Sequence, residues 1–315
     1  NKPFHDGRLS ALGVYVQDDM QFGRLKLLAG LRHDRVKGSA AAMNNGRVTT
    51  GIKRSDSATS GSLGALYEVT PLLRPYVSVA RGFRAADLRE RYQNGPRQDG
   101  FFWIGSPQIA PEKATQFELG VKGDSGELDY AVALWRNRIS NYITGTQLTG
   151  ADAMVCGAQA AACKQTVNLG RATLSGLDAS VNWQVAPGHR LSAGYSHVRG
   201  SNRDLGEPLY QMPADELNVS WEAGLAGGWS ADMWLRHVWR QNRVATVFAR
   251  GTEQPSPGFT TLGLGASWQR GPHQLRLAVH NLTNKTYREH LAEGLPGYKV
   301  PAPGRSFVVQ YQMEF

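Results

Sequence analysis

Apolar and polar residues alternate along most of this chain, and this alternation constrains the fold more than any other feature. In 177–183 the odd-numbered residues are Leu, Ala, Val and Trp, and the residues between them are Asp, Ser and Asn. A repeat of two residues places successive side chains on opposite faces of a β-strand. No segment sustains the 3.6-residue repeat of an amphipathic helix. The chain is therefore predicted to be all-β.

The alternating segments number about thirteen, and most are longer than the roughly 5–6 residues of strands in soluble proteins. A tilted strand that crosses a bilayer needs about 9–11 residues. The segments that we predict as strands are 9–22, 24–37, 57–69, 72–82, 113–124, 127–144, 166–186, 189–201, 213–224, 229–243, 259–270, 273–287 and 304–315.

The connections between these strands alternate in length. Short turns fall at 22–23, 70–71, 124–126, 186–188, 226–228 and 271–272. Long connections fall between them, at 38–56, 83–112, 145–165, 202–212, 244–258 and 288–303. Short periplasmic turns alternating with long extracellular loops are typical of an outer-membrane barrel. We therefore predict an antiparallel transmembrane β-barrel.

Thirteen is an odd number, whereas single-chain bacterial barrels have an even number of strands. The first connection is short, so the first strand runs toward the periplasm, and an odd number of strands is expected before residue 1. The first 30 residues contain no charged segment followed by an apolar one, as a signal peptide would. We expect residues 1–315 to form the C-terminal part of a larger barrel.

Composition narrows the function classes. No apolar stretch approaches the roughly 18 residues of a transmembrane helix, and a mean hydropathy of −0.39 suits a barrel because alternating strands average out. The net charge is +9, but Lys and Arg are spread along the chain rather than gathered in a stripe, so no nucleic-acid partner is expected. The histidines show no metal-ligand spacing, and no catalytic constellation emerges. We expect no enzyme, no metal site and no cofactor.

The two cysteines lie in a stretch rich in Gly and Ala. Cys156 and Cys163 have six residues between them. A loop disulfide formed in an oxidising compartment is the expected arrangement. A metal-binding pair is the alternative, although no His or further Cys lies nearby in the sequence.

Several short segments resemble motifs of the TonB-dependent outer-membrane receptors. Each motif is weak alone, but their order and spacing along nearly the whole chain are specific. Ala86 for Pro and Ser106 for Asn are departures that weaken the subgroup assignment more than the family assignment. The matching segments are YVQDD (15–19), GLRHD (30–34), RGFRAADL (81–88), GSPQIAPE (105–112), FELG (117–120), NLG (168–170), GLD (176–178), HNLTNKTY (280–287) and PGR (303–305).

The resemblance implies the last thirteen strands of a barrel of about 22, with the plug domain and TonB box expected upstream. It implies energy-coupled uptake of a metal chelate, with a ferric siderophore expected first and copper, haem or cobalamin as family alternatives. Haem receptors of the family tend to carry a His between the FRAP-like and NPxL-like segments, and 84–106 contains none. The implied partners are TonB–ExbB–ExbD and outer-membrane lipid, and the implied form is a monomer in the bacterial outer membrane.

Two loops are candidates for binding the chelate, because Arg supplies planar cationic donors and aromatic rings stack on flat ligands. For the aromatic residues of 83–112, the alternative is a place in the girdle at the outer membrane interface. The candidates in 83–112 are Arg84, Arg89, Arg91, Tyr92, Arg97, Phe101, Phe102 and Trp103. The candidates in 287–299 are Tyr287, Arg288, His290 and Tyr298.

Charged residues within barrel strands are expected to face the lumen, since an Arg facing lipid at mid-membrane costs roughly 2–4 kcal/mol. Arg236 and Arg240 share parity in the predicted strand 229–243 and are expected on that face. Pairing with carboxylates of the plug is the first expectation for them, and contact with an anionic ligand is the alternative. Two other classes stay open: a passive porin without a plug, and a barrel hydrolase whose activity would depend on His290.

Overall fold

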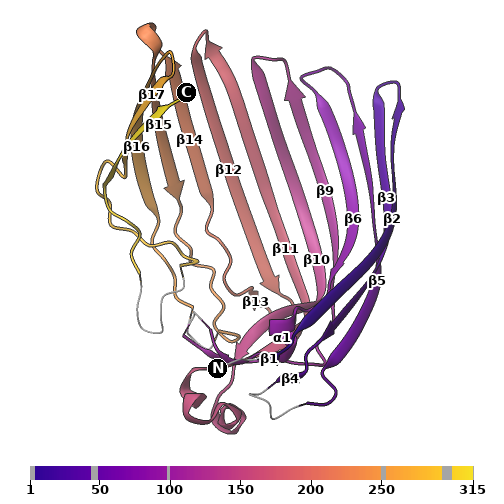
Figure 1. Ribbon diagram of the computed structural model, residues 1–315. Coiled ribbons are helices and arrows are strands. Elements are labelled where there is room, and N and C mark those ends of the chain that lie inside the picture. The colour runs from indigo at the N-terminus through magenta and orange to yellow at the C-terminus, as the bar shows by residue number, and fades with distance from the viewer. Residues whose placement is uncertain (1–3, 44–48, 98–99, 250–252, 293–299, 315) are drawn as a thin grey trace.

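Thirteen long antiparallel strands follow one another across a single curved sheet in the computed structural model (Figure 1). The structure describes residues 4–43, 49–97, 100–249, 253–292 and 300–314. Each strand pairs with its neighbours along the chain, so the sheet order follows the sequence order. The predicted all-β antiparallel fold is confirmed. None of the helices in the described ranges is long and apolar enough to cross a membrane.

The thirteen strands match the thirteen predicted segments one for one. They are β2 (Arg8–Phe22), β3 (Leu25–Ser39), β5 (Lys53–Tyr67), β6 (Arg74–Arg84), β9 (Glu112–Asp124), β10 (Leu128–Gln147), β11 (Cys163–Ala186), β12 (His189–Asn202), β14 (Glu216–Gly224), β15 (Trp229–Val238), β16 (Phe259–Arg270), β17 (His273–His280) and β18 (Ser306–Met313). The shorter elements are β1 (Phe4–His5), β4 (Ala42–Met43), α1 (Leu88–Tyr92), β7 (Asn94–Pro96), β8 (Phe102–Ile104), β13 (Glu207–Pro208) and the 3-10 segments η1 (Gly150–Ala162) and η2 (Ala226–Gly228).

The two ends of the sheet differ, as the alternating connection lengths predict. The short turns lie at the top of Figure 1, and α1, β13 and the other small elements of the long connections lie at the bottom. The tight turns at Gly23 and Gly271 have φ of 58° and 55°, a conformation that glycine adopts without steric cost. One end of the sheet therefore consists of short turns, and the other end carries folded loops.

The two faces of the sheet also differ. Phe117 and Leu119 on β9 are each 53% exposed, although both are large and apolar. Between them Glu118 is half-buried on the other face, where it accepts a hydrogen bond from the Tyr76 hydroxyl at 2.9 Å. Leu119 is in register with Leu134, which continues the apolar row. An apolar face of this extent requires lipid or another partner, and the opposite face carries the polar pairs.

At the loop end of the sheet, two strands end several residues earlier than the sequence pattern predicts. β15 ends at Val238, so Arg240 lies in the following connection and the parity argument that placed it beside Arg236 in one strand is wrong. Gln241 ends the regular pairing there by donating hydrogen bonds to the carbonyls of Met212 and Pro213. β17 ends at His280 because Asn281 adopts φ of 49° and turns the chain.

Candidate ligand-binding loops

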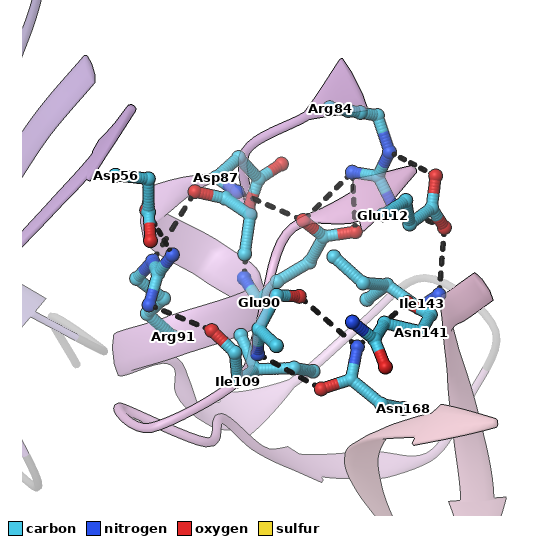
Figure 2. A network of polar contacts seen from close by, with 12 residues as sticks. Asp56, Arg84, Asp87, Glu90, Arg91, Ile109, Glu112, Asn141, Ile143 and Asn168 are labelled. Atoms are coloured by element: carbon cyan, nitrogen blue, oxygen red, sulfur yellow. Dashed lines mark hydrogen bonds and ion pairs between the residues drawn. The ribbon is translucent and has the colours of Figure 1, made fainter. Parts of the chain in front are cut away.

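The connection between β6 and β9 is a folded unit built around the one-and-a-half-turn helix α1. The Asp87 carboxylate accepts the Glu90 N–H at 2.7 Å, and the Glu90 carboxylate accepts the Asp87 N–H at 2.8 Å. This reciprocal pair is a capping box, which satisfies two backbone donors at the start of the helix. Figure 2 shows this helix start and the polar network around it. The sequence LRERY can therefore form a stable turn despite its shortness.

Arg91 lies inside this unit rather than on its surface. Its side chain is 1% exposed, and its guanidinium donates to Asp56 at 2.5 Å and to the carbonyls of Pro107 and Ile109 at 3.1 and 3.0 Å (Figure 2). Tyr92 is equally buried and donates to the Gly38 carbonyl at 3.3 Å. Burial raises the pKa of the Tyr92 hydroxyl, which keeps it a neutral donor. Both side chains tie the connection to the strands.

Arg84 anchors the same unit at the end of β6. It forms ion pairs with Glu90 at 2.8 Å and with Glu112 at 2.9 Å, so it links the helix to β9. The Glu112 carboxylate also accepts the Ile143 N–H of β10 at 2.6 Å. On β11, Asn168 exchanges both amide hydrogen bonds with the backbone of Ala110 (Figure 2). The motif segments GFRAADL and SPQIAPE are thus the anchors of this loop.

A cluster of aromatic rings and cations lies beside the anchors. Its members, which we call the cation–aromatic cluster, are Arg97, Phe101, Trp103, Lys164 and Tyr210. The Arg97 guanidinium lies 4.0 Å from the Trp103 ring centre, and the Lys164 ammonium lies 3.8 Å from that of Phe101. The same ammonium lies 5.4 and 5.7 Å from the rings of Trp103 and Tyr210. These distances are within the range of cation–π attraction.

Strand pairing between β8 and β11 positions Trp103 of the cation–aromatic cluster. β8 pairs in parallel with the start of β11, so Trp103 lies opposite Lys164. Gly145 on β10 leaves the space that the Trp103 indole occupies, since a Cβ atom at that position would collide with the ring. Phe102 instead packs against the buried group that contains Cys156 and Cys163. The two cysteines are joined in a disulfide, with Cα atoms 6.1 Å apart, which links Cys156 within η1 to Cys163 directly after it.

The second candidate segment, 287–292, is held against β15 and β16. Tyr287 stacks on Phe259 with ring centres 4.1 Å apart, and Arg236 forms ion pairs with Glu289 at 2.5 Å and Glu216 at 2.8 Å. Arg236 is thus on the polar face, with two carboxylates of this chain. Arg288 is half-buried, and Tyr298 lies outside the described residues.

His290 is held more deeply than the rest of that segment. Its side chain is 5% exposed, with Nε2 3.3 Å from the Glu253 carboxylate and Nδ1 3.1 Å from the Ser256 hydroxyl. Glu253 also accepts the N–H groups of Gln211 and Ala245 at 2.7 and 2.6 Å. His290 therefore joins three connections, and it lies buried rather than at an accessible surface.

The two candidate segments belong to one continuous layer of loops. Tyr210 of the cluster contacts Phe248, with ring centres 6.1 Å apart, and Phe248 packs with Ala245 and Ala249. The same connection supplies Glu253, the partner of His290. Contacts thus run without interruption from Trp103 to His290, and the long connections act as one folded surface.

The structure sorts the predicted residues into three groups. One group is held by hydrogen bonds or ion pairs within this chain: Arg84, Arg91, Tyr92 and His290. A second group forms part of the cation–aromatic cluster: Arg97, Phe101 and Trp103. The third group is exposed: Arg89 and Arg240. Lys164 and Tyr210 were not predicted, because they come from other connections and no local pattern marks them. Among the described residues, no group of three or more His, Cys, Asp or Glu side chains is placed to hold a metal ion.

Long antiparallel strands, an apolar outer face and folded loops at one end define a wall segment of an outer-membrane barrel. The sequence matches the family model described as TonB dependent receptor-like, beta-barrel, over residues 1–282. The chain belongs to the TonB-dependent receptor family, whose members are transporters of the bacterial outer membrane and not enzymes.

Known proteins with similar sequences and structures agree with that family. The metal-pseudopaline receptor CntO of Pseudomonas aeruginosa is 24% identical over 295 residues, which are 89% of this chain and 38% of that protein. The heme/hemopexin utilization protein C of Haemophilus influenzae is 23% identical over 311 residues, 90% of this chain and 41% of that protein. The structure of the copper transporter OprC superimposes with a TM-score of 0.84 at 22% identity, covering 98% of this chain and 48% of OprC. The chain therefore spans about two fifths to one half of these relatives.

Proposed function

We propose that this chain forms barrel wall and ligand-binding loops of a receptor that imports an anionic metal chelate, specifically a ferric siderophore, by TonB-dependent transport. Residues 1–315 would act as one unit in this role. Relatives named for pseudopaline, haem and copper support a metal-related cargo in general. The finer assignment depends on the chemistry of the loops.

The cation–aromatic cluster is the observation that carries the proposal. A ferric siderophore of the catecholate type presents negative charge and flat rings together. Arg97 would supply the opposite charge at the surface and the buried Lys164, which is 5% exposed, would supply it from behind the rings, while Phe101, Trp103 and Tyr210 would supply faces for stacking. Cations already placed against rings lose little side-chain entropy on binding, which favours affinity.

The anchors have a different role in the proposal. Arg84 and Arg91 hold the loop by ion pairs within this chain, so we assign them to positioning. Arg89 is exposed on α1 and adds positive charge to the same connection. Arg236 positions the segment 287–292 through Glu289, which makes Arg240 the more accessible of the two predicted lumen arginines. TonB–ExbB–ExbD would act on parts of the receptor other than these loops.

Binding measurements on the full receptor in detergent test the proposal. A panel of ferric catecholate and hydroxamate siderophores, haem, copper and cobalamin is titrated against the receptor and its Arg97→Gln and Trp103→Leu variants. We expect a ferric catecholate to bind and each variant to weaken it about tenfold, the order of one charge-assisted or stacking contact. The control is Arg270→Gln, an equal charge change on an exposed residue at the short-turn end.

Growth of a deletion strain on the same panel under limitation adds a functional readout. Restored growth on one chelate, lost with Trp103→Leu and kept with Arg270→Gln, is the expected pattern. If growth is independent of the receptor for every member of the panel, transport of these nutrients is refuted. If a ligand binds but neither cluster variant weakens it, the site assignment is wrong while transport stands.

A further inference from the structure

An open pocket of about 430 Å³ lies at the loop end of β12, and none of its lining residues belongs to the cation–aromatic cluster. β12 ends at Asn202, and the chain turns back through β13, so the pocket takes side chains from both faces of the sheet at its rim. The polar residues that line it are Arg171, Ser201, Asn202, Arg203, Glu207 and Arg243.

Asn202 is the most deeply buried of these residues. It is 1% exposed, and its side-chain oxygen accepts the N–H groups of Asp204 and Leu205 at 3.1 and 3.2 Å. Its amide nitrogen is buried and has no hydrogen-bond partner among the described residues. Buried donors are nearly always paired, because an unpaired one loses its hydration without compensation. Because protein atoms enclose this donor, the exposed arginines of the pocket are the groups that a bound ligand can reach.

The charges around the pocket favour an anionic acceptor. Three guanidinium groups line it, against the carboxylate of Glu207. The Glu207 carboxylate accepts hydrogen bonds from the backbone N–H groups of Thr246, Val247 and Phe248 at 2.7, 2.9 and 2.7 Å. These donors stabilise its negative charge within the protein. The neighbouring Asp204 carboxylate accepts the Arg171 N–H at 3.0 Å and lies 3.6 Å from its guanidinium. Arg203 and Arg243 are both exposed, one from each connection.

The position of the pocket relative to the apolar face points to lipid. Arg171 has the parity of Leu177 on β11, and the N–H of Arg203 donates to its carbonyl at 3.0 Å, so both arginines continue the apolar face toward the loops. On the same face, Tyr195 and Trp239 pack edge to face with ring centres 5.7 Å apart. Amphipathic rings of this kind mark the interface of a bilayer. The arginines beyond them lie at the level of the lipid headgroups.

We propose that this pocket binds a phosphate group, with Arg203 and Arg243 as the cationic clamp. Guanidinium groups recognise phosphate oxygens through paired N–H bonds. The phosphate belongs to an outer-leaflet lipid headgroup in this arrangement, and a free phosphate ion has the same chemistry. The site is separate from the proposed chelate site and would persist if that proposal failed.

Two ligands distinguish the sources of phosphate. The full receptor in phosphatidylcholine nanodiscs is compared with nanodiscs that also contain phosphatidic acid, whose headgroup is a phosphate monoester, and retained lipid is measured by native mass spectrometry. Inorganic phosphate is titrated separately by calorimetry. The variants are Arg203→Gln and Arg243→Gln, and the matched control is Arg270→Gln at the opposite end of the sheet.

We expect retained phosphatidic acid, weakened about tenfold by each pocket variant and unchanged by Arg270→Gln. Binding of inorganic phosphate with the same variant pattern, without lipid retention, assigns the pocket to soluble phosphate and overturns the lipid source. Equal retention by all three variants overturns the pocket as the phosphate site. Each variant is run on gels with and without heating, and the same heat-dependent shift in migration as in the unsubstituted receptor confirms that it has folded as a barrel. A loss of binding is then attributable to the substituted residue.

Discussion

Replacing Arg91 by Met should open the loop between β6 and β9 without unfolding the barrel. The substitution leaves Asp56 buried without its 2.5 Å partner and removes the donors that reach the carbonyls of Pro107 and Ile109. Removing one partner of a buried ion pair costs about 3–5 kcal/mol. In the variant, Asp56 still has the Arg54 guanidinium at 3.6 Å as a partner, so we take the lower value of this cost, about 3 kcal/mol.

A cost of about 3 kcal/mol corresponds to roughly a 150-fold rise in the population of the open loop. Amide hydrogen exchange measures this rise directly, because the N–H groups of Gly105, Ser106 and Ile109 are bonded within the folded loop. Their exchange should accelerate by about two powers of ten, while exchange in β10 and β11 stays unchanged. Chelate affinity should fall with it, because the cluster depends on the loop.

Arg84→Met is the matched control, since it removes an equal charge from the same loop. Arg84 is 46% exposed, and exposed ion pairs contribute only about 0–1 kcal/mol each. Loss of its two pairs should therefore accelerate exchange in the loop by less than about 30-fold. Equal effects of the two substitutions, or an unchanged exchange rate in Arg91→Met, would refute the reasoning. Asp56→Asn combined with Arg91→Met should recover part of the protection, because no buried charge is then left unpaired.

Two further predictions concern the loops. Gly145→Val should displace the Trp103 ring, shift the tryptophan emission and weaken chelate binding, whereas Gly82→Ala, which has open space around its Cβ position, should do neither. Burial raises the pKa of Glu207, but the N–H groups of Thr246, Val247 and Phe248 outweigh it and hold the pKa below its usual range. The stabilisation from Glu207 is therefore present above the ordinary pKa of a glutamate and is lost as the pH falls through its lowered value. Proteolysis of the connection 239–258 should rise over that acidic range, and a Glu207→Gln variant that keeps the same pH dependence would contradict this account.

The strands were predictable because lipid on one face and polar side chains on the other impose a repeat of two residues. All thirteen were found, and the largest errors lie at their loop ends. There the pattern continues by chance while the backbone turns away, as at Asn281 with φ of 49°. Alternation reports which face a side chain takes, and it does not report where the hydrogen-bonded ladder stops.

The cation–aromatic cluster was predicted only in part, because its members come from several connections. The sequence also grouped Arg91, which is buried on Asp56 35 residues away, with the exposed Arg89 two residues before it. Lys164 and Tyr210 join the cluster from two other loops. Long-range pairing of this kind depends on sheet register, which places β8 beside β11.

The anchors also change how the charge of the loop is understood. In the described part of this connection and its strand ends, Arg84 is paired with Glu90 and Glu112, and Arg91 is paired with Asp56, so these charges cancel locally. The net charge of 83–112 therefore does not describe the proposed ligand site, because Arg84 and Arg91 belong to the anchors, whereas Arg97 packs on Trp103 and Lys164 is contributed by β11.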